Sequence, residues 1–186
     1  MKSLSDFIFH KNIFPKNLCD QIIDAYKEEL FIRDSHHNRE TRHLGELNIS
    51  DHNVIDKKNS YERKYVEQKV FTFIGSLILD YIKTTNSPHL KIEHDIGYSL
   101  RQMNKGDYYA EHDDDSHGEL TGSRRLTVSI CLNEEYKGGD FTFFEEEHIV
   151  KLKKGDVLVF PSNFMYPHGV QEILEGTRYQ LLTWLR

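Results

Sequence analysis

Apolar residues recur at helical spacing in two segments of the first half of the chain. The first segment follows Pro15, with Asn17 as its expected N-cap. The second opens on Asn59 and Glu62, which have capping-box spacing, and runs to Ile82. Both helices are expected to cover one face of a sheet. Their apolar faces comprise Leu18, Ile22, Ala25, Tyr26 and Leu30, and then Tyr65, Val66, Val70, Phe73, Ile74, Leu77, Ile78, Tyr81 and Ile82.

From about residue 92 the apolar pattern changes to a period of two, which is typical of β-strands. Ile96, Tyr98, Leu100 and Gln102 alternate with other residues, and so do Leu126, Val128, Ile130 and Leu132. Many short strands separated by turn glycines favour a sandwich or jelly roll over alternating βαβ units. Further strands are expected at 140–145, 148–152, 157–161, 167–173 and 178–185.

The segment 32–59 separates the two helices and shows no clear periodicity. It is polar and rich in His, Asn, Asp and Arg. A stretch of this length without a pattern is usually mobile or functional, so we expect a solvated loop or lid. The chain is therefore expected to form one domain over 1–186, with a mostly helical support region at 1–90 and a β core at 92–186.

Composition and charge exclude several classes of protein. The formal net charge is −6 over 186 residues, which argues against a broad basic face for nucleic acid. No apolar run approaches the length that crosses a bilayer, and the start lacks the apolar stretch of a secretory signal. Cys19 and Cys131 show no zinc-ribbon spacing, so a reducing, cytoplasmic setting is expected.

Candidate metal chemistry lies in the run from Tyr108 to Asp115. In an extended strand, residues two apart project to the same face, so His112 and Asp114 point together. His168, at the start of a late strand, is the best third ligand. Two histidines and one carboxylate form the facial triad of non-haem Fe(II) oxygenases. Taken alone, the same run also fits an acidic turn.

Arg178 lies ten residues after His168 and favours the metal interpretation. A late antiparallel strand places its guanidinium inside the barrel. A buried arginine needs an acidic partner, and a bound dicarboxylate supplies one. A structural ion pair is the alternative.

The chain from about Ile96 to Arg186 resembles the catalytic domain of prolyl 4-hydroxylase-type dioxygenases that depend on 2-oxoglutarate and Fe(II). The matching segments occur in family order: Gly106-Asp107-Tyr108-Tyr109 with His112 and Asp114; Arg125-Leu126-Thr127; Leu132-Asn133; Gly138-Gly139-Asp140-Phe141-Thr142-Phe143; Lys154 to Pro161; His168; Gly176-Thr177-Arg178-Tyr179; and Trp184.

The resemblance implies a mainly β fold, a double-stranded β-helix (jelly roll) core flanked by N-terminal helices. It assigns Fe(II) to His112, Asp114 and His168, and the distal carboxylate of 2-oxoglutarate to Arg178. Tyr109 and Trp184 become wall residues near the metal and cosubstrate, for which ordinary core packing is the alternative. Gln102 and Thr127 are weaker candidates for contacts with 2-oxoglutarate. O2 is the second cosubstrate, and ascorbate is a further candidate cofactor.

Three positions depart from the family pattern. Cys131 stands where relatives often carry a tyrosine that hydrogen-bonds the cosubstrate, so the contacts to 2-oxoglutarate must differ. Met103 stands where a tyrosine is common. Collagen-type members often place lysine at the position of Arg178. None of these changes affects the three metal ligands.

The sequence therefore predicts a dioxygenase that hydroxylates an unactivated C–H bond and releases succinate and CO2. The resemblance favours a peptidyl proline, as in the procollagen-type enzymes, with 116–124 and 32–59 as lid segments around a peptide or protein substrate. A free amino acid or another small molecule is the alternative substrate. A non-catalytic jelly-roll binding module is the alternative from another class. No Ser/His/Asp hydrolase, P-loop or dinucleotide motif is present.

Overall fold

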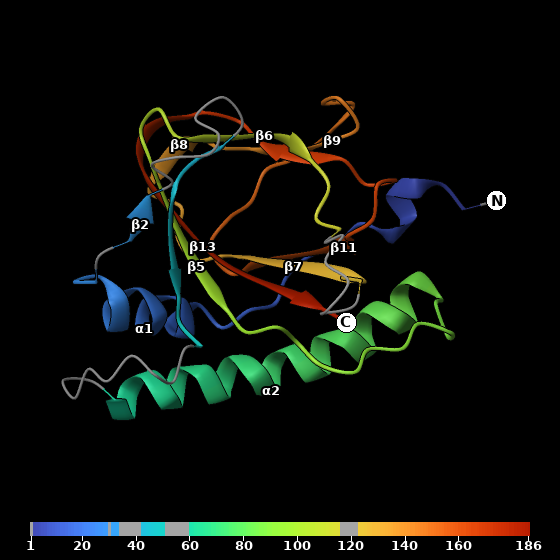
Figure 1. Ribbon diagram of the computed structural model, residues 1–186, viewed down its shortest axis with the longest axis horizontal. Helices are drawn as coiled ribbons and strands as arrows, with labels where there is room; N and C mark the ends of the chain where they lie inside the picture. Colours follow the sequence, from blue (N-terminus) through green and yellow to red (C-terminus); the bar gives the residue numbers. More distant parts are fainter. Residues whose placement is uncertain (1, 30, 34–41, 51–59, 116–122) are drawn as a thin grey trace.

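The computed structural model describes residues 2–29, 31–33, 42–50, 60–115 and 123–186, arranged in three layers (Figure 1). The helical elements are the 3-10 helix η1 (Leu4–Phe7), α1 (Lys16–Tyr26) and α2 (Ser60–Thr85). The strands are β1 (Phe9–Asn12), β2 (Ile32–Arg33), β3 (Arg42–His43), β4 (Gly45–Asn48), β5 (Ser99–Asn104), β6 (Tyr108–His112), β7 (Leu126–Cys131), β8 (Tyr136–Gly138), β9 (Phe141–Phe143), β10 (His148–Val150), β11 (Asp156–Pro161), β12 (His168–Val170) and β13 (Ile173–Leu185).

Two antiparallel sheets face each other and form the expected jelly roll. The larger sheet has the order β1-β11-β7-β13-β5-β4-β2, with β8 paired to β13. The smaller has the order β10-β9-β12-β6-β3. Neighbours in these sheets are often distant in sequence, because the chain crosses repeatedly from one sheet to the other. Figure 1 shows the smaller sheet above the larger one, and both helices below.

Both helices pack on the outer face of the larger sheet, as the sequence predicts. Their buried side chains share one hydrophobic cluster with the strands, including Ile22 of α1, Val70 of α2 and Ile130 of β7. The expected N-cap of the first helix is wrong. The helix begins at Lys16 with Pro15 in the N-cap position, which therefore contributes no side-chain hydrogen bond. Asn17 is already inside the first turn.

Alternation along the central strands divides their side chains between the helix-facing cluster and the space between the sheets. On β13, Leu181 and Leu185 join the helix-facing cluster, whereas Arg178 and Gln180 bond to each other between the sheets. On β5, Leu100 faces the helices. The interior of the barrel is therefore lined by Arg178 and Gln180 together with a second apolar cluster that includes Met103, Phe143 and Phe160.

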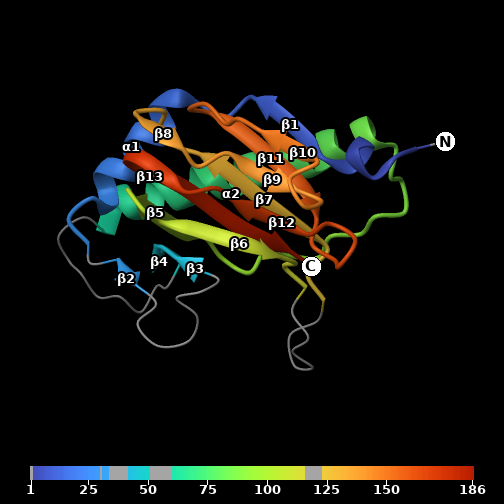
Figure 2. The same cartoon turned by 90° about the horizontal axis from the view of Figure 1, so that it is seen from above.

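The interpretation of 32–59 as one continuous loop is wrong for part of the segment. Strands β2 and β4 extend the larger sheet beyond β5, and β3 pairs with β6 of the smaller sheet. Figure 2 shows these strands gathered at one edge of the molecule. Leu44 and Ile49 are buried there, at 2% and 8% exposure. Residues 34–41 and 51–59, with most of the second candidate lid at 116–122, lie outside the described residues.

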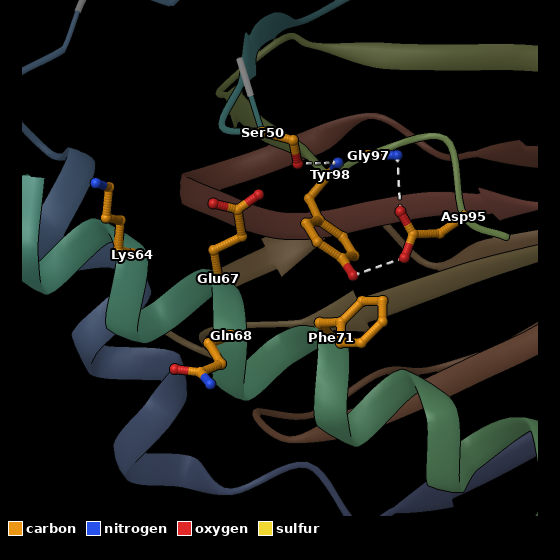
Figure 3. Close-up of a pocket in the computed structure, with 8 residues that line it drawn as sticks. All are labelled: Ser50, Lys64, Glu67, Gln68, Phe71, Asp95, Gly97 and Tyr98. Carbon is orange, nitrogen blue, oxygen red and sulfur yellow. Dashed lines mark hydrogen bonds between the residues drawn. The ribbon is translucent and has the colours of Figure 1, made fainter. Parts of the chain in front are cut away.

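A hollow of about 350 Å³ lies between α2 and the segment that leads into β5 (Figure 3). Its polar groups largely satisfy one another. The Tyr98 hydroxyl donates to Asp95 Oδ2 (2.9 Å), and the other Asp95 oxygen accepts from the Gly97 N–H (3.0 Å). Burial raises the pKa of Tyr98, and the bond to Asp95 raises it further, so the hydroxyl stays a donor. We interpret this hollow as part of the packing contact between α2 and the larger sheet, and not as a ligand site.

Tyr98→Phe is expected to lower the free energy of unfolding by about 1 kcal/mol, because the Asp95 carboxylate loses its hydroxyl donor. For a chain of this length the melting temperature should fall by about 2–4 °C. Thermal and urea unfolding measure the change. Tyr61→Phe is the matched control, since Tyr61 is 83% exposed. Equal stability of the two variants would show that the Tyr98–Asp95 bond contributes nothing.

Within the described residues, neither helix combines the length and apolar character needed to span a membrane.

Candidate active site

The structure brings His112, Asp114 and His168 together, as the sequence predicts. His112 ends β6 and His168 begins β12, and these strands pair with the two histidines in register. Asp114 follows two residues after His112 and is 6% exposed. One candidate ligand atom from each residue lies within 4.8 Å of the others. The strand pairing thus places three metal-ligating groups at one point in the barrel.

Both imidazoles are oriented by backbone carbonyls. His112 Nδ1 lies 2.9 Å from the Ala110 oxygen, and His168 Nδ1 lies 3.1 Å from the Tyr166 oxygen. A carbonyl only accepts, so each Nδ1 donates to it and Nε2 is left to face the third residue. The Nε2 atoms of His112 and His168 lie 3.4 Å and 3.3 Å from the Asp114 carboxylate oxygens, and His112 Nε2 is buried without a hydrogen-bond partner among the described residues. A ring held at Nδ1 by a carbonyl, with Nε2 directed at the site, is the arrangement of a histidine ligand to a metal.

The Asp114 carboxylate is fixed from the opposite side. Its Oδ2 accepts from the Thr127 hydroxyl at 2.7 Å, and Thr127 is itself 2.9 Å from the Ser162 hydroxyl. Burial raises the pKa of Asp114, but the adjacent His112 and His168 lower it by more, so its pKa lies well below the ordinary value. The carboxylate is therefore ionised and held in one orientation.

Thr127→Val is expected to weaken Fe(II) binding by about 10–100-fold, because Asp114 loses the hydroxyl that orients it. Valine has nearly the same shape, so the fold should be retained. The measurement is an anaerobic Fe(II) titration of metal-free protein. Thr142→Val on β9 is the control. Thr142 is also a buried threonine, but it is neither one of the three candidate ligands nor hydrogen-bonded to Asp114. An unchanged Fe(II) affinity in Thr127→Val would rule out the proposed support of Asp114.

Arg178 is fully buried, at 0% exposure, between the sheets. Its Nη1 donates to Gln180 Oε1 (2.6 Å) and lies 3.4 Å from Met103 Sδ. Its Nε and Nη2 have no hydrogen-bond partner in the described part of the chain. Gly139 packs closely beside it: a Cβ there would lie 2.4 Å from Ile173 Cδ1 and 3.2 Å from Arg178 Cδ, and its φ of +67° also favours glycine. Two unused donors on a buried cation fit an absent carboxylate.

Tyr109 and Trp184 lie in the neighbourhood of the metal ligands. The Tyr109 ring stacks on His112 with centroids 3.7 Å apart. Trp184 is connected to Tyr109 through the Arg101 guanidinium, whose carbon lies 5.5 Å from the Tyr109 ring and 5.6 Å from the Trp184 ring. Their roles as walls of the site stay predictions that this placement supports.

Thr127 and Gln102 are placed differently from the expectation. Thr127 contacts the metal ligand Asp114. The Gln102 amide donates to Tyr179, whose ring packs on the helix-facing cluster. The structure therefore does not bring Gln102 together with Arg178 and the metal ligands.

Two residues of the cosubstrate region were missed from the sequence. Gln180 lies two residues after Arg178, so the period of a strand places both on one face. Tyr136 of β8 has no comparable signal, because its position depends on the pairing of β8 with β13. Its hydroxyl lies 3.4 Å from Cys131 Sγ. A tyrosine hydroxyl is thus present beside Cys131, the position where the resemblance leads us to expect a tyrosine.

Comparison with known proteins agrees with this architecture. Residues 98–186 match the profile described as the 2OG-Fe(II) oxygenase superfamily. A PKHD-type hydroxylase of Janthinobacterium sp. (strain Marseille) is 31% identical over 90 residues, 44% of this chain and 39% of the relative. A PKHD-type hydroxylase of Rippkaea orientalis is 32% identical over 136 residues, 69% of this chain and 57% of the relative. The first of these matches spans about two fifths of the relative's length.

Solved structures share the fold at low sequence identity. A viral collagen prolyl hydroxylase from Paramecium Bursaria Chlorella virus-1, as its 2OG complex, superimposes with a TM-score of 0.68 and 16% identity, covering 97% of this chain and 96% of the other. A Pseudomonas putida prolyl-4-hydroxylase gives a TM-score of 0.66 and 17% identity, with 96% and 91% coverage.

A jelly roll that holds two histidines and one carboxylate at one point defines the architecture of a non-haem Fe(II) oxygenase. Residues 98–186 therefore have the sequence profile of the 2OG-Fe(II) oxygenase superfamily, and the curated relatives that this chain resembles are PKHD-type hydroxylases. Fe(II), 2-oxoglutarate and O2 are the cofactor and cosubstrates of this superfamily. The unpartnered His112 Nε2 and the unpartnered donors of Arg178 fit the metal and the dicarboxylate respectively.

Proposed function

We propose that the protein is a dioxygenase that uses Fe(II) and 2-oxoglutarate to hydroxylate an unactivated C–H bond of a peptidyl proline, with release of succinate and CO2. The observation that carries the proposal is a group of three candidate metal ligands, two of them buried, in the same barrel as a buried arginine with two donors that have no partner among the described residues. A metal centre alone would fit many functions. Arg178 also needs a carboxylate inside the barrel to bind its unused donors, and this need favours 2-oxoglutarate.

Within this proposal, His112, Asp114 and His168 hold Fe(II), and Arg178 with Gln180 orients the distal carboxylate of 2-oxoglutarate. Bound Fe(II) with 2-oxoglutarate and O2 supplies the oxidising power for the C–H bond. The protein binds and orients the reactants. The aromatic rings of Phe141, Phe143 and Phe160 pack around His168 and exclude water from its imidazole.

The substrate assignment rests on the relatives. Several prolyl hydroxylases share the fold, and one from Trichoplax adhaerens was solved with a fragment of the hypoxia inducible factor oxygen degradation domain. A peptide or protein substrate is therefore the proposal, and a procollagen-like proline is its narrower form. A free amino acid remains the alternative within the same chemistry.

We also propose that 1–186 acts as one domain, with ascorbate as an optional reductant. The helices share one hydrophobic cluster with the larger sheet, and a second cluster lies between the two sheets, so every layer packs on the same central sheet, which supports one folding unit. A cytoplasmic location stays an expectation, supported by two free, buried cysteines.

The experiment is an anaerobic titration of metal-free protein with Fe(II) and then 2-oxoglutarate, followed by the visible charge-transfer band of the chelate. The band should form in wild type. Proline-containing peptides are then screened aerobically for succinate release and a mass increase of one oxygen. If the protein binds iron but the band never forms, the proposed cosubstrate is wrong and the binding-module alternative gains support.

A further inference from the structure

Arginine side chains gather around the only tryptophan of the chain, beside the metal ligands. The Arg124 guanidinium carbon lies 3.8 Å from the centroid of the Trp184 ring, and that of Arg101 lies 5.6 Å from it. Arg124 Nη1 also donates to the backbone oxygen of Asp114 at 3.1 Å. Arg101 approaches the Tyr109 ring that stacks on His112. The cluster therefore adjoins two of the three metal ligands.

The cluster holds several hydrogen-bond donors that have no partner among the described residues. The Nε atoms of Arg101 and Arg124 and the indole Nε1 of Trp184 are buried without a hydrogen-bond partner in the described residues. Arg101 is only 6% exposed. Buried polar groups are nearly always hydrogen-bonded, and all three of these groups can only donate. Several unused donors in one place indicate that an acceptor group belongs there.

Nearby carboxylates do not fill this role. Glu46 Oε1 is 3.8 Å from Arg101 Nε, which is too long for a hydrogen bond, and the same oxygen accepts from Ser99. Asp115 Oδ1 is also buried without a hydrogen-bond partner among the described residues, and Asp115 borders the same hollow as Arg124. Asp115 nevertheless forms no hydrogen bond or ion pair with Arg124 within the described part of the chain, so the unused donors of the two arginines and the tryptophan are not satisfied by it.

We propose that Arg101, Arg124 and Trp184 bind a carboxylate of the substrate, held next to the carbon that is hydroxylated. The inference rests on the proposed function and deepens it, because it names a chemical feature of the substrate. Arginine binds a carboxylate through its planar fork, and an indole N–H supplies an additional donor. The carboxylate belongs either to an acidic side chain beside the target residue or to a free α-carboxyl group.

The 2-oxoglutarate molecule is the competing source of this carboxylate. Arg101 is the register partner of Gln180, which contacts Arg178, so the two arginine sites are neighbours. However, Arg178 has two unused donors of its own for the distal carboxylate. Arg178 therefore suits the distal carboxylate of 2-oxoglutarate, and Arg101 with Arg124 suits a second carboxylate from the substrate. The test must show which of these two carboxylates the second pair of arginines binds.

Trp184 gives the test a reporter at the site, since any tryptophan fluorescence of this chain comes from it. Full-length protein is loaded with Zn(II) and 2-oxoglutarate, so that binding is measured without turnover. The probes are two pairs: N-acetylproline against N-acetylprolinamide, and a capped peptide with Glu on both sides of proline against the same peptide with Gln. We expect the carboxylate member of at least one pair to bind about tenfold tighter or more. The discriminating pair identifies the source of the carboxylate.

The variants are Arg101→Gln and Arg124→Gln, and either should abolish the preference for the carboxylate. Arg124→Lys keeps the charge without the fork and should keep part of it. Arg125→Gln is the matched control, because it removes one exposed positive charge from the same segment and should bind like wild type. If Arg101→Gln does not fold, the half-buried Arg124 still decides the result.

Three results would overturn the inference. In the first, wild type binds both members of each pair equally. In the second, Arg124→Gln keeps the preference for the carboxylate. In the third, Arg101→Gln and Arg124→Gln weaken 2-oxoglutarate binding, and both variants still bind the carboxylate probe more tightly than its uncharged partner. This result would assign the two arginines to the cosubstrate. Failure of the proposed function is a separate outcome: the chelate band is absent with Fe(II), whether or not the fluorescence discriminates the probes.

Discussion

Replacing His168 by alanine is expected to weaken Fe(II) binding by more than about 100-fold, the upper end of what loss of an outer-sphere partner costs. His168 is 3% exposed, and its Nδ1 bond to Tyr166 leaves Nε2 as the ligand atom. The variant retains two ligands, which cannot occupy one face of the metal as three do. The measurement is an anaerobic Fe(II) titration, with the chelate band as a second readout.

The controls separate ligation from folding. His168 packs against Phe141 and Phe160, with ring centroids 5.5 and 4.6 Å away, so alanine leaves a cavity among aromatic rings. His168→Gln keeps most of the volume and should lose Fe(II) in the same way while melting closer to wild type. His94→Ala removes an exposed histidine and should change neither property. Near-normal Fe(II) affinity in both His168 variants would eliminate it as a ligand.

Two of the three candidate metal ligands were predictable from their spacing. His112 and Asp114 are two residues apart and lie on one side of the chain, although β6 ends at His112 and Asp114 follows it. His168 meets His112 through the pairing of β12 with β6, and its choice as third ligand rested on its place at the start of a late strand. Alternation also accounts for the position of Gln102. The sequence pattern Ile96, Tyr98, Leu100, Gln102 already groups Gln102 with apolar residues, and the structure packs Tyr98 and Leu100 against the helices. The interior positions of β5 are therefore Arg101 and Met103.

Features that depend on pairing between distant strands could not be read from the sequence. β2, β3 and β4 contain two to four residues each, too few to show a period. β4 and β3 form on the edges of β5 and β6, and β2 then pairs with β4. β1 pairs with β11 across nearly 150 residues of chain. Thr127 was predicted to contact 2-oxoglutarate, but its bond to Asp114 depends on how β7 meets the end of β6. In each case the tertiary partner, which no local pattern records, determines the structure.

Arg178→Met is expected to abolish 2-oxoglutarate binding without destabilising the cosubstrate-free protein. A fully buried guanidinium with two unused donors destabilises the fold, since its lost hydration is only partly replaced. Methionine fills much of the same space without charge, so the free protein should melt at or above the wild-type temperature. Removing a buried charge usually lowers the melting temperature. Here we expect no decrease, because the proposed ionic partner of Arg178 is a ligand that the free protein does not contain.

Added 2-oxoglutarate should then reverse the order of stability. A ligand at about 100 times its dissociation constant stabilises the native state by about 2.7 kcal/mol, which raises the melting temperature of wild type by several degrees. Arg178→Met should show no rise, and Arg178→Lys an intermediate one, because lysine keeps the charge without the two-pronged geometry. Melting curves of the metal-loaded proteins with and without 2-oxoglutarate measure both effects. A full ligand-induced rise in Arg178→Met would place the distal carboxylate elsewhere in the barrel.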